Sequence, residues 1–146
     1  MSTRDKPSRF LAGRTGAATI EFVLTIPLFL VALAFSFEFG QLFLAHQSTV
    51  NNARSAVRYL ARTNLSFNDF QRANNIIRTG QATGGSSPDY LDDVCPAVLS
   101  CASIDDGNIS VQIVVNYPLR LFRFIDGGQR TSIPFVVQEN ARWAGM

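Results

Sequence analysis

An uncharged apolar run of about 16 residues, Phe22–Phe37, limits what this 146-residue chain can fold into. As a helix that rises 1.5 Å per residue, the run is roughly 24 Å long, and its extension over residues 17–45 is roughly 43 Å long. The longer segment crosses the hydrocarbon core of a bilayer if Glu21 and Glu38 are tolerated near its two ends. We therefore expect one membrane-spanning helix over residues 17–45.

The charges of the chain predict the orientation of this helix. The first 16 residues carry four basic side chains and one acidic side chain, which gives about +3 by counting. Because basic flanks stay on the cytoplasmic side, we expect the N-terminus inside and the rest of the chain outside. The net charge of +2 for the whole chain is too small to indicate nucleic-acid binding.

Helical periodicity continues beyond the apolar segment. Apolar residues recur at steps of three and four, namely Val50, Ala53, Val57 and Leu60. We predict one helix over about residues 17–62, with this stripe packed into a core; a partner-binding face is the alternative. Arg54 and Arg58 are expected on a solvated face, with acidic lipids or a neighbouring chain as other possible partners.

A second, shorter helix is predicted after residue 65. Ser66-Phe-Asn-Asp69 resembles a capping box with Asp in place of Glu, and Gly80 is a natural helix stop. Phe67, Phe70 and Ile77 should then share one face of this helix.

Residues 80–108 are rich in turn formers, and a loop of this length needs something to hold it in place. Cys95 and Cys101 lie on the side of the membrane where a disulfide can form, so we predict a bridge between them, with two free thiols as the alternative. With His46 as the single histidine, no four-ligand zinc site is possible. The acidic pairs of the loop lack the spacing of a dedicated calcium loop.

The last third of the chain has the alternating pattern of strands. Residues 109–117 predict a half-buried strand, residues 119–125 a second strand, and residues 133–144 a third. Residues 126–129 predict a hairpin turn, and Pro134 suits a sheet edge or a strand start. The predicted fold class is α+β, with a long N-terminal helix, transmembrane in its first half, packed by a short helix and a small antiparallel sheet.

Residues 14–22 combine three features that point to processing. The basic leader ends in Gly16, a small residue follows, and Glu21 stands at the fifth position after Gly16. This arrangement resembles the class III signal of type IV pilins and pseudopilins, which a prepilin peptidase cuts before the apolar segment.

A longer stretch of the chain resembles one family more closely. The TadE-like family, minor pilins of the Tad (Flp) pilus, is similar to three segments: Gly13–Leu28, Phe37–Gly40 and Asn52–Tyr59. The resemblance implies a pseudopilin-like minor subunit of a type IVb pilus. It also implies a prepilin peptidase, a major Flp-type pilin, a TadE- or TadF-like sister subunit and Tad platform proteins as partners.

The resemblance gives Glu21 a physical role. Cleavage after Gly16 would create an α-amino group on Ala17, and Glu21 of one subunit could neutralise the amine of a neighbour. The alternative is that Glu21 simply favours a helix N-terminus. Glu38 is expected to be an interfacial acid at the far end of the span.

The expected organisation is a cleaved basic leader (residues 1–16), a transmembrane helix (17–45) and a periplasmic α+β domain (46–146). The protein would lie in a bacterial inner membrane, or enter the extracellular pilus. We expect no enzyme, no cofactor and no metal, because no nucleophile–base pair, phosphate loop or metal set is visible.

Two other fates of the N-terminus remain open at the level of sequence. Ala32-Leu-Ala34 is a small-x-small motif, so a Sec signal peptide cut after Ala34 would release a secreted domain. A chain that is never cut would be a single-pass envelope scaffold.

Overall fold

The computed structural model describes residues 15–95, 101–121, 127 and 131–144, called the described residues below. The chain divides into two compact units, Met1–Phe37 and Glu38–Met146, and we take each by itself. All but the last two positions of the expected leader lie outside the described residues.

Helix α1, Thr15–Leu60, confirms the predicted long helix and runs through Pro27 without a break. In the first unit most of its large apolar side chains are exposed, among them Leu24, Leu28 and Phe29. Two hydroxyls on this part of α1 bond within the helix. Thr25 donates to the Glu21 carbonyl at 2.7 Å, and Ser36 donates to the Ala32 carbonyl at 2.9 Å. By length and composition α1 is suited to cross a membrane, where backbone and hydroxyl groups need partners inside the helix.

In the second unit, α1 buries one face against the core. The buried positions recur at steps of three and four: Ala45, Thr49, Ala53, Ala56, Val57 and Leu60. Val50 packs at the edge of the same core. The interpretation of the sequence stripe as a core face is therefore confirmed.

Helix α2, Phe67–Thr79, has the two ends that the sequence predicts. The Ser66 side chain accepts from the Asp69 backbone, the Asp69 side chain accepts from the Ser66 backbone, and Gly80 ends the helix with φ 77°. Phe70 and Ile77 are buried, but Phe67 is 63% exposed. The prediction for Phe67 was wrong, because the buried face is centred on Ala73 and the first residue of the helix lies beyond its edge.

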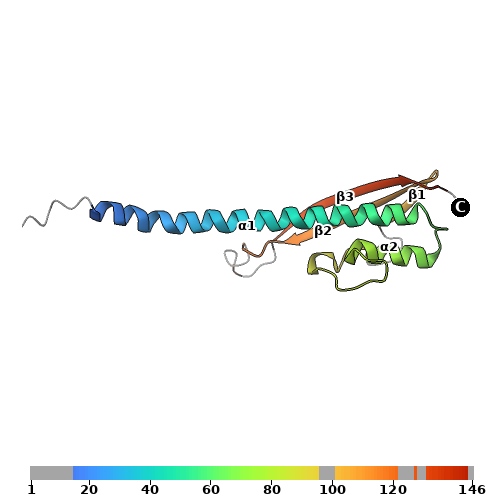
Figure 1. Ribbon diagram of the computed structural model, residues 1–146, viewed down its shortest axis with the longest axis horizontal. Helices are drawn as coiled ribbons and strands as arrows, with labels where there is room; N and C mark the ends of the chain where they lie inside the picture. The colour runs from blue at the N-terminus through green and yellow to red at the C-terminus, as the bar shows by residue number, and fades with distance from the viewer. Residues whose placement is uncertain (1–14, 96–100, 122–126, 128–130, 145–146) are drawn as a thin grey trace, which may run out of the picture. The chain divides into compact units, whose positions relative to one another are not determined.

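Three antiparallel strands form one sheet in the order β1-β2-β3. They are β1 (Ala102–Asp105), β2 (Asn108–Pro118) and β3 (Ser132–Arg142), and β2 and β3 run alongside the C-terminal half of α1 (Figure 1). Alternate residues of β2 are buried, namely Ile109, Val111, Ile113, Val115 and Tyr117. Pro134 lies in β3, an edge strand, as predicted.

Two of the strand predictions need correction. The predicted loop 80–108 contains β1 and a short 3-10 helix, η1 (Asp89–Leu91). Residues 119–121 of the predicted second strand form no strand, and the rest of that strand lies outside the described residues, as does most of the predicted turn 126–129. β2 ends at Pro118, which has no N–H to continue the ladder.

The core of the second unit joins α1, α2, η1 and the sheet. Leu60 of α1, Ile76 of α2, Leu91 of η1 and Ile113 of β2 belong to one buried cluster. A smaller cluster of Ala45, Tyr117 and Leu119 lies at the other end of β2. The predicted α+β fold, a long apolar helix packed by a short helix and an antiparallel sheet, is confirmed.

Candidate functional site

The first turns of α1 hold the residues that the sequence singled out for processing and assembly. Gly16 and Glu21 are both exposed, and Ile20 and Phe22 beside the acid are each 65% exposed. The ion pairs found among the described residues are Arg54–Glu139 and Arg78–Asp92, and neither involves Glu21. Glu21 is thus a carboxylate on an exposed apolar surface, and no cation of the described residues pairs with it.

Glu38, the second acid of the apolar region, has a different environment. It is 8% exposed, and its Oε1 accepts the backbone N–H of Arg120 at 2.6 Å. A carboxylate that accepts a backbone N–H makes a strong, charge-assisted bond, and this one fastens the chain just after β2 to α1. The interfacial position of Glu38 stays a prediction; its partner could not be found from the sequence because it lies 82 residues away.

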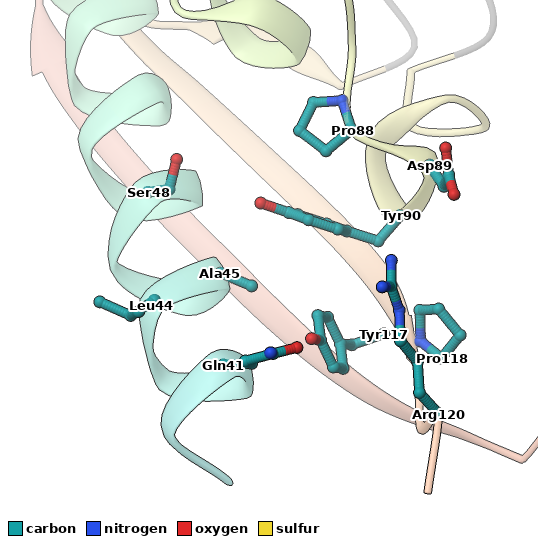
Figure 2. Close-up of a pocket in the computed structure, with 10 residues that line it drawn as sticks. All are labelled: Gln41, Leu44, Ala45, Ser48, Pro88, Asp89, Tyr90, Tyr117, Pro118 and Arg120. Atoms are coloured by element: carbon teal, nitrogen blue, oxygen red, sulfur yellow. The ribbon is translucent and has the colours of Figure 1, made fainter. Parts of the chain in front are cut away.

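Beside Glu38, three separate segments enclose a groove of about 520 Å³ (Figure 2). One wall is α1, the second is η1, and the third is the end of β2 with the residues after it. The lining residues are Gln41, Leu44, Ala45, Ser48, Pro88, Asp89, Tyr90, Tyr117, Pro118 and Arg120. Sequence patterns could not reveal this groove, because its walls come together only in the fold.

Two tyrosines face each other in the groove, with ring centroids 5.5 Å apart. Burial raises the pKa of the Tyr90 hydroxyl, and a hydrogen bond with Ser48 only partly opposes this. Burial also raises the pKa of the Tyr117 hydroxyl, and the Glu38 carboxylate adds to the increase. Both hydroxyls therefore stay neutral at physiological pH and can donate hydrogen bonds.

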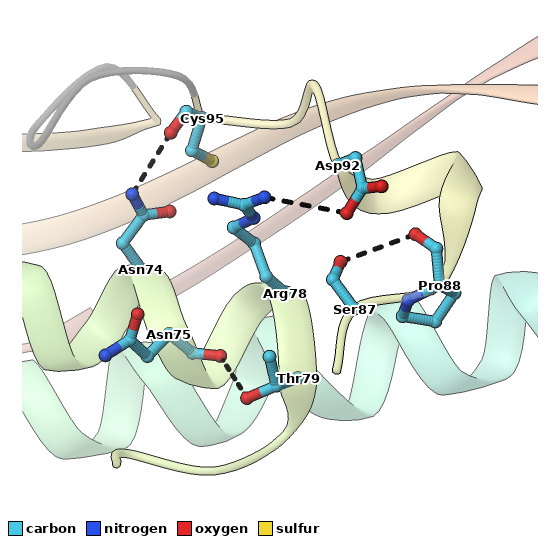
Figure 3. Close-up of polar contacts among 8 residues, drawn as sticks. All are labelled: Asn74, Asn75, Arg78, Thr79, Ser87, Pro88, Asp92 and Cys95. Atoms are coloured by element: carbon cyan, nitrogen blue, oxygen red, sulfur yellow. Dashed lines mark hydrogen bonds and ion pairs between the residues drawn. The ribbon is translucent and has the colours of Figure 1, made fainter. Parts of the chain in front are cut away.

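A polar cluster holds the segment between α2 and β1 in place (Figure 3). Asn74 donates its side-chain amide to the Cys95 carbonyl at 3.0 Å, and Arg78 lies 3.6 Å from the Asp92 carboxylate. Cys95 and Cys101 form the expected disulfide, with Cα atoms 5.4 Å apart. The disulfide and the side chains of Asn74 and Arg78 hold in place a segment for which the sequence predicts a loop.

The two arginines of the α1 stripe differ in their contacts. Arg54 Nε lies 2.9 Å from the Glu139 carboxylate of β3, although the Arg54 side chain is 55% exposed. Arg58 is exposed. The sequence places both arginines on a solvated face but does not reveal the Arg54–Glu139 ion pair. Because this ion pair is partly exposed, it adds little to stability.

Two acidic residues of the predicted loop have structural roles. Asp92 pairs with Arg78, and Asp106 and Gly107 form the two-residue turn between β1 and β2. Within the part of the chain that the structure describes, no group of three or more His, Cys, Asp or Glu side chains could hold a metal ion.

The fold and the exposed acid define a class: an α+β protein of pilin-like architecture with an N-terminal helix that can cross a membrane. Residues 16–58 match the family described as TadE-like protein, so the resemblance seen in the sequence is confirmed over this segment. The matched segment includes Gly16, Glu21 and Glu38. No curated protein and no solved structure gives a significant match.

Proposed function

We propose that this chain is a minor, pseudopilin-like subunit for assembly of a Tad (Flp-type, type IVb) pilus. Its N-terminus lies in the cytoplasm, residues 17–45 cross the bacterial inner membrane, and residues 46–146 lie in the periplasm. A prepilin peptidase cuts the leader after Gly16. The mature subunit then works at the base of the pilus or enters the extracellular fibre.

The observation that carries this proposal is the TadE-like match over residues 16–58, which covers the processing site and the apolar part of α1. The structure supports it with a helix that exposes most of its large apolar side chains between Ile20 and Phe37, and with a separate folded unit that begins at Glu38. An exposed apolar helix that precedes a folded unit in the chain can insert into a membrane and can then pack against the helices of other subunits.

Glu21 gives the proposal its chemistry. A carboxylate on a lipid-facing surface is costly, and so is the α-amino group that cleavage would create on Ala17. When two subunits meet, the carboxylate of one can neutralise the amine of the other, so both costs fall only in the assembled state. The pair would therefore fix the register of neighbouring helices.

The partners follow from the same proposal. The prepilin peptidase acts first. A TadE- or TadF-like sister subunit and the platform proteins then bind the mature subunit. The major Flp-type pilin forms the fibre that this subunit primes or caps. The chain has no catalytic role in this scheme.

The test is the N-terminal sequence of the protein recovered from membranes of cells that also make a prepilin peptidase. We expect the mature chain to begin at Ala17. Gly16→Ser should leave the chain uncut and still inserted, because the substitution adds a side chain at the scissile bond without changing the apolar segment. Gly13→Ser, in the same leader but away from the cut, is the matched control and should be processed normally.

Other outcomes identify the other fates. A chain that begins at Phe35 would be a secreted domain released after Ala34, and an intact N-terminus in the wild type would indicate an envelope scaffold. Normal processing of the Gly16→Ser chain would place the cut elsewhere and contradict the proposal.

A further inference from the structure

The second unit begins with a stretch of α1 that is buried on one side and apolar on the other. Glu38 and Ala45 are 8% and 5% exposed, whereas Phe39, Phe43 and Leu44 are 58%, 62% and 68% exposed. These exposed side chains need an apolar neighbour such as lipid. Leu44 also lines the groove described above, so the exposed apolar surface continues into one wall of the groove.

Two opposite charges stand at the rim of the same groove. Arg120 and Asp89 are both exposed, and neither forms an ion pair with another described residue. Figure 2 shows the Arg120 side chain extending past Pro118 toward Tyr90, with Asp89 on the same side of the groove. The rim of the groove thus carries one cation and one anion, which form no ion pair with each other.

Neutral hydrogen-bonding groups complete the lining. The hydroxyls of Tyr90 and Tyr117 are neutral, and Gln41 and Ser48 add an amide and a hydroxyl from α1. Tyrosines whose rings pack against apolar groups while their hydroxyls reach polar ones are typical of a membrane–water interface. The groove therefore combines an apolar wall, interfacial tyrosines and a zwitterionic rim.

We propose that this groove binds the headgroup of a zwitterionic phospholipid of the phosphoethanolamine class. The Arg120 guanidinium binds the lipid phosphate, Asp89 binds the ammonium group, and the acyl chains lie against Leu44, the exposed apolar side chain that lines the groove. The inference rests on the membrane insertion contained in the proposed function, but it does not depend on cleavage or on pilus assembly.

The charges favour this headgroup over the other common classes. An anionic headgroup would satisfy Arg120 but would leave Asp89 facing a second negative charge, which is unfavourable. A choline headgroup carries the same two charges, but its quaternary ammonium cannot donate a hydrogen bond to the Asp89 carboxylate. An inorganic phosphate would leave the apolar wall without a partner.

Native mass spectrometry of the purified full-length chain, released from detergent micelles, can measure which lipid it retains. The chain is incubated with equal amounts of phosphatidylethanolamine, phosphatidylglycerol and phosphatidylcholine that have identical acyl chains. We expect the wild type to retain phosphatidylethanolamine about fivefold over the other two, as one partly exposed charge-assisted bond allows. Arg120→Gln should retain about fivefold less phosphatidylethanolamine than the wild type. Asp89→Asn should retain phosphatidylethanolamine and phosphatidylglycerol in a ratio close to one.

Two variants keep the result interpretable. Arg58→Gln removes an exposed arginine of α1 that does not line the groove, and it should retain lipid like the wild type. Arg120→Lys keeps the charge and should retain most of the binding, which separates loss of a phosphate contact from loss of the fold. Thermal unfolding by circular dichroism should be the same for the four variants.

The proposal would be overturned if Arg120→Gln retained lipid like Arg58→Gln, or if the three headgroups were retained equally by the wild type. Protein dimers in place of lipid adducts, lost on Arg120→Gln, would assign the groove to a second copy of the chain and also overturn it. Because the measurement uses the purified chain in micelles, a failure to be cut after Gly16 would leave it unaffected.

Discussion

Two glutamates on α1 meet the problem of a carboxylate in an apolar region in different ways. Glu38 is buried in the second unit and accepts the Arg120 N–H, so its charge is stabilised within one chain. Glu21 is exposed between exposed apolar neighbours, and no described cation pairs with it. The described part of the chain thus supplies a hydrogen-bond donor to the Glu38 carboxylate and no cation to the Glu21 carboxylate.

The residue-scale prediction concerns Glu21. Glu21→Gln should cut the amount of sister subunit that co-purifies from solubilised membranes by at least about tenfold, because an unpaired charge left in an apolar interface costs about 3 kcal/mol or more. Glu21→Asp keeps the charge and should retain part of the interaction. The measurement is co-purification of tagged subunits, with the number of surface pili as a second readout.

Insertion and processing are the controls for this prediction. Both variants should resist extraction by alkaline carbonate and begin at Ala17, which shows that the assembly step alone is affected. If Glu21→Gln co-purified with its partners as well as the wild type does, the pairing role would be wrong.

At the scale of elements, local signals predicted the helices well and the sheet in part. The capping box at Ser66, the stop at Gly80 and the alternation of β2 each depend on neighbours in sequence. β1 was missed because it is only four residues long and alternates poorly, with the burial pattern intermediate–exposed–exposed–exposed. Asp106-Gly107, with φ 45° and 76°, is the hairpin signal that could have located it.

The element-scale prediction concerns the N-terminus of α2. Ser66→Ala removes the side-chain oxygen that accepts from the Asp69 backbone, and it should lower the midpoint of thermal unfolding of the second unit by about 4 °C or more. Ser55→Ala is the matched control, because the exposed Ser55 hydroxyl bonds only to the Asn51 carbonyl of its own helix. The control variant should unfold within about 1 °C of the wild type.

The same cap has a predictable pH dependence. Hydrogen bonds from the Ser66 side chain and backbone hold the pKa of Asp69 below its ordinary value of 3.8. A lowered folded-state pKa stabilises the protein above pH 3.8, and this contribution is lost as the pH falls through the lowered value. The difference between Ser66→Ala and the wild type should therefore be full at pH 7 and smaller at pH 3; an equal difference at both values would contradict the role of the Asp69 carboxylate.

At the scale of the whole molecule, the boundary between membrane helix and folded domain stays a prediction. Composition extends the apolar segment to Ala45, since Phe39 and Phe43 follow Glu38 without a break in hydropathy. The structure begins its second compact unit at Glu38, and Ala45 is buried there with Tyr117 and Leu119. The groove could not be predicted from the sequence, because its walls are three segments that only the fold brings together.

Two fragments test which boundary holds. A chain of residues 38–146 keeps Glu38, the hydrogen bond to Arg120 and the cluster of Ala45, Tyr117 and Leu119. A chain of residues 46–146 lacks Glu38 and therefore its hydrogen bond to Arg120, and it also lacks the Ala45 contact with Tyr117 and Leu119. We expect the longer fragment to be more stable to denaturant by about 2 kcal/mol or more, since a hydrogen bond to a charged group contributes that much and the lost apolar burial adds to it.

Both fragments would be unfolded in guanidinium with the same mild detergent present, because Phe39, Phe43 and Leu44 are exposed in the longer one. A third fragment, residues 38–146 with Glu38→Gln, isolates the contribution of the carboxylate and should fall between the other two. Equal stability of the two unsubstituted fragments would mean that residues 38–45 add nothing to the folded unit and that the boundary lies at residue 46. The expected ranking would instead show that residues 38–45 have two functions. Their exposed apolar side chains face the surroundings, and their buried side chains stabilise the folded unit.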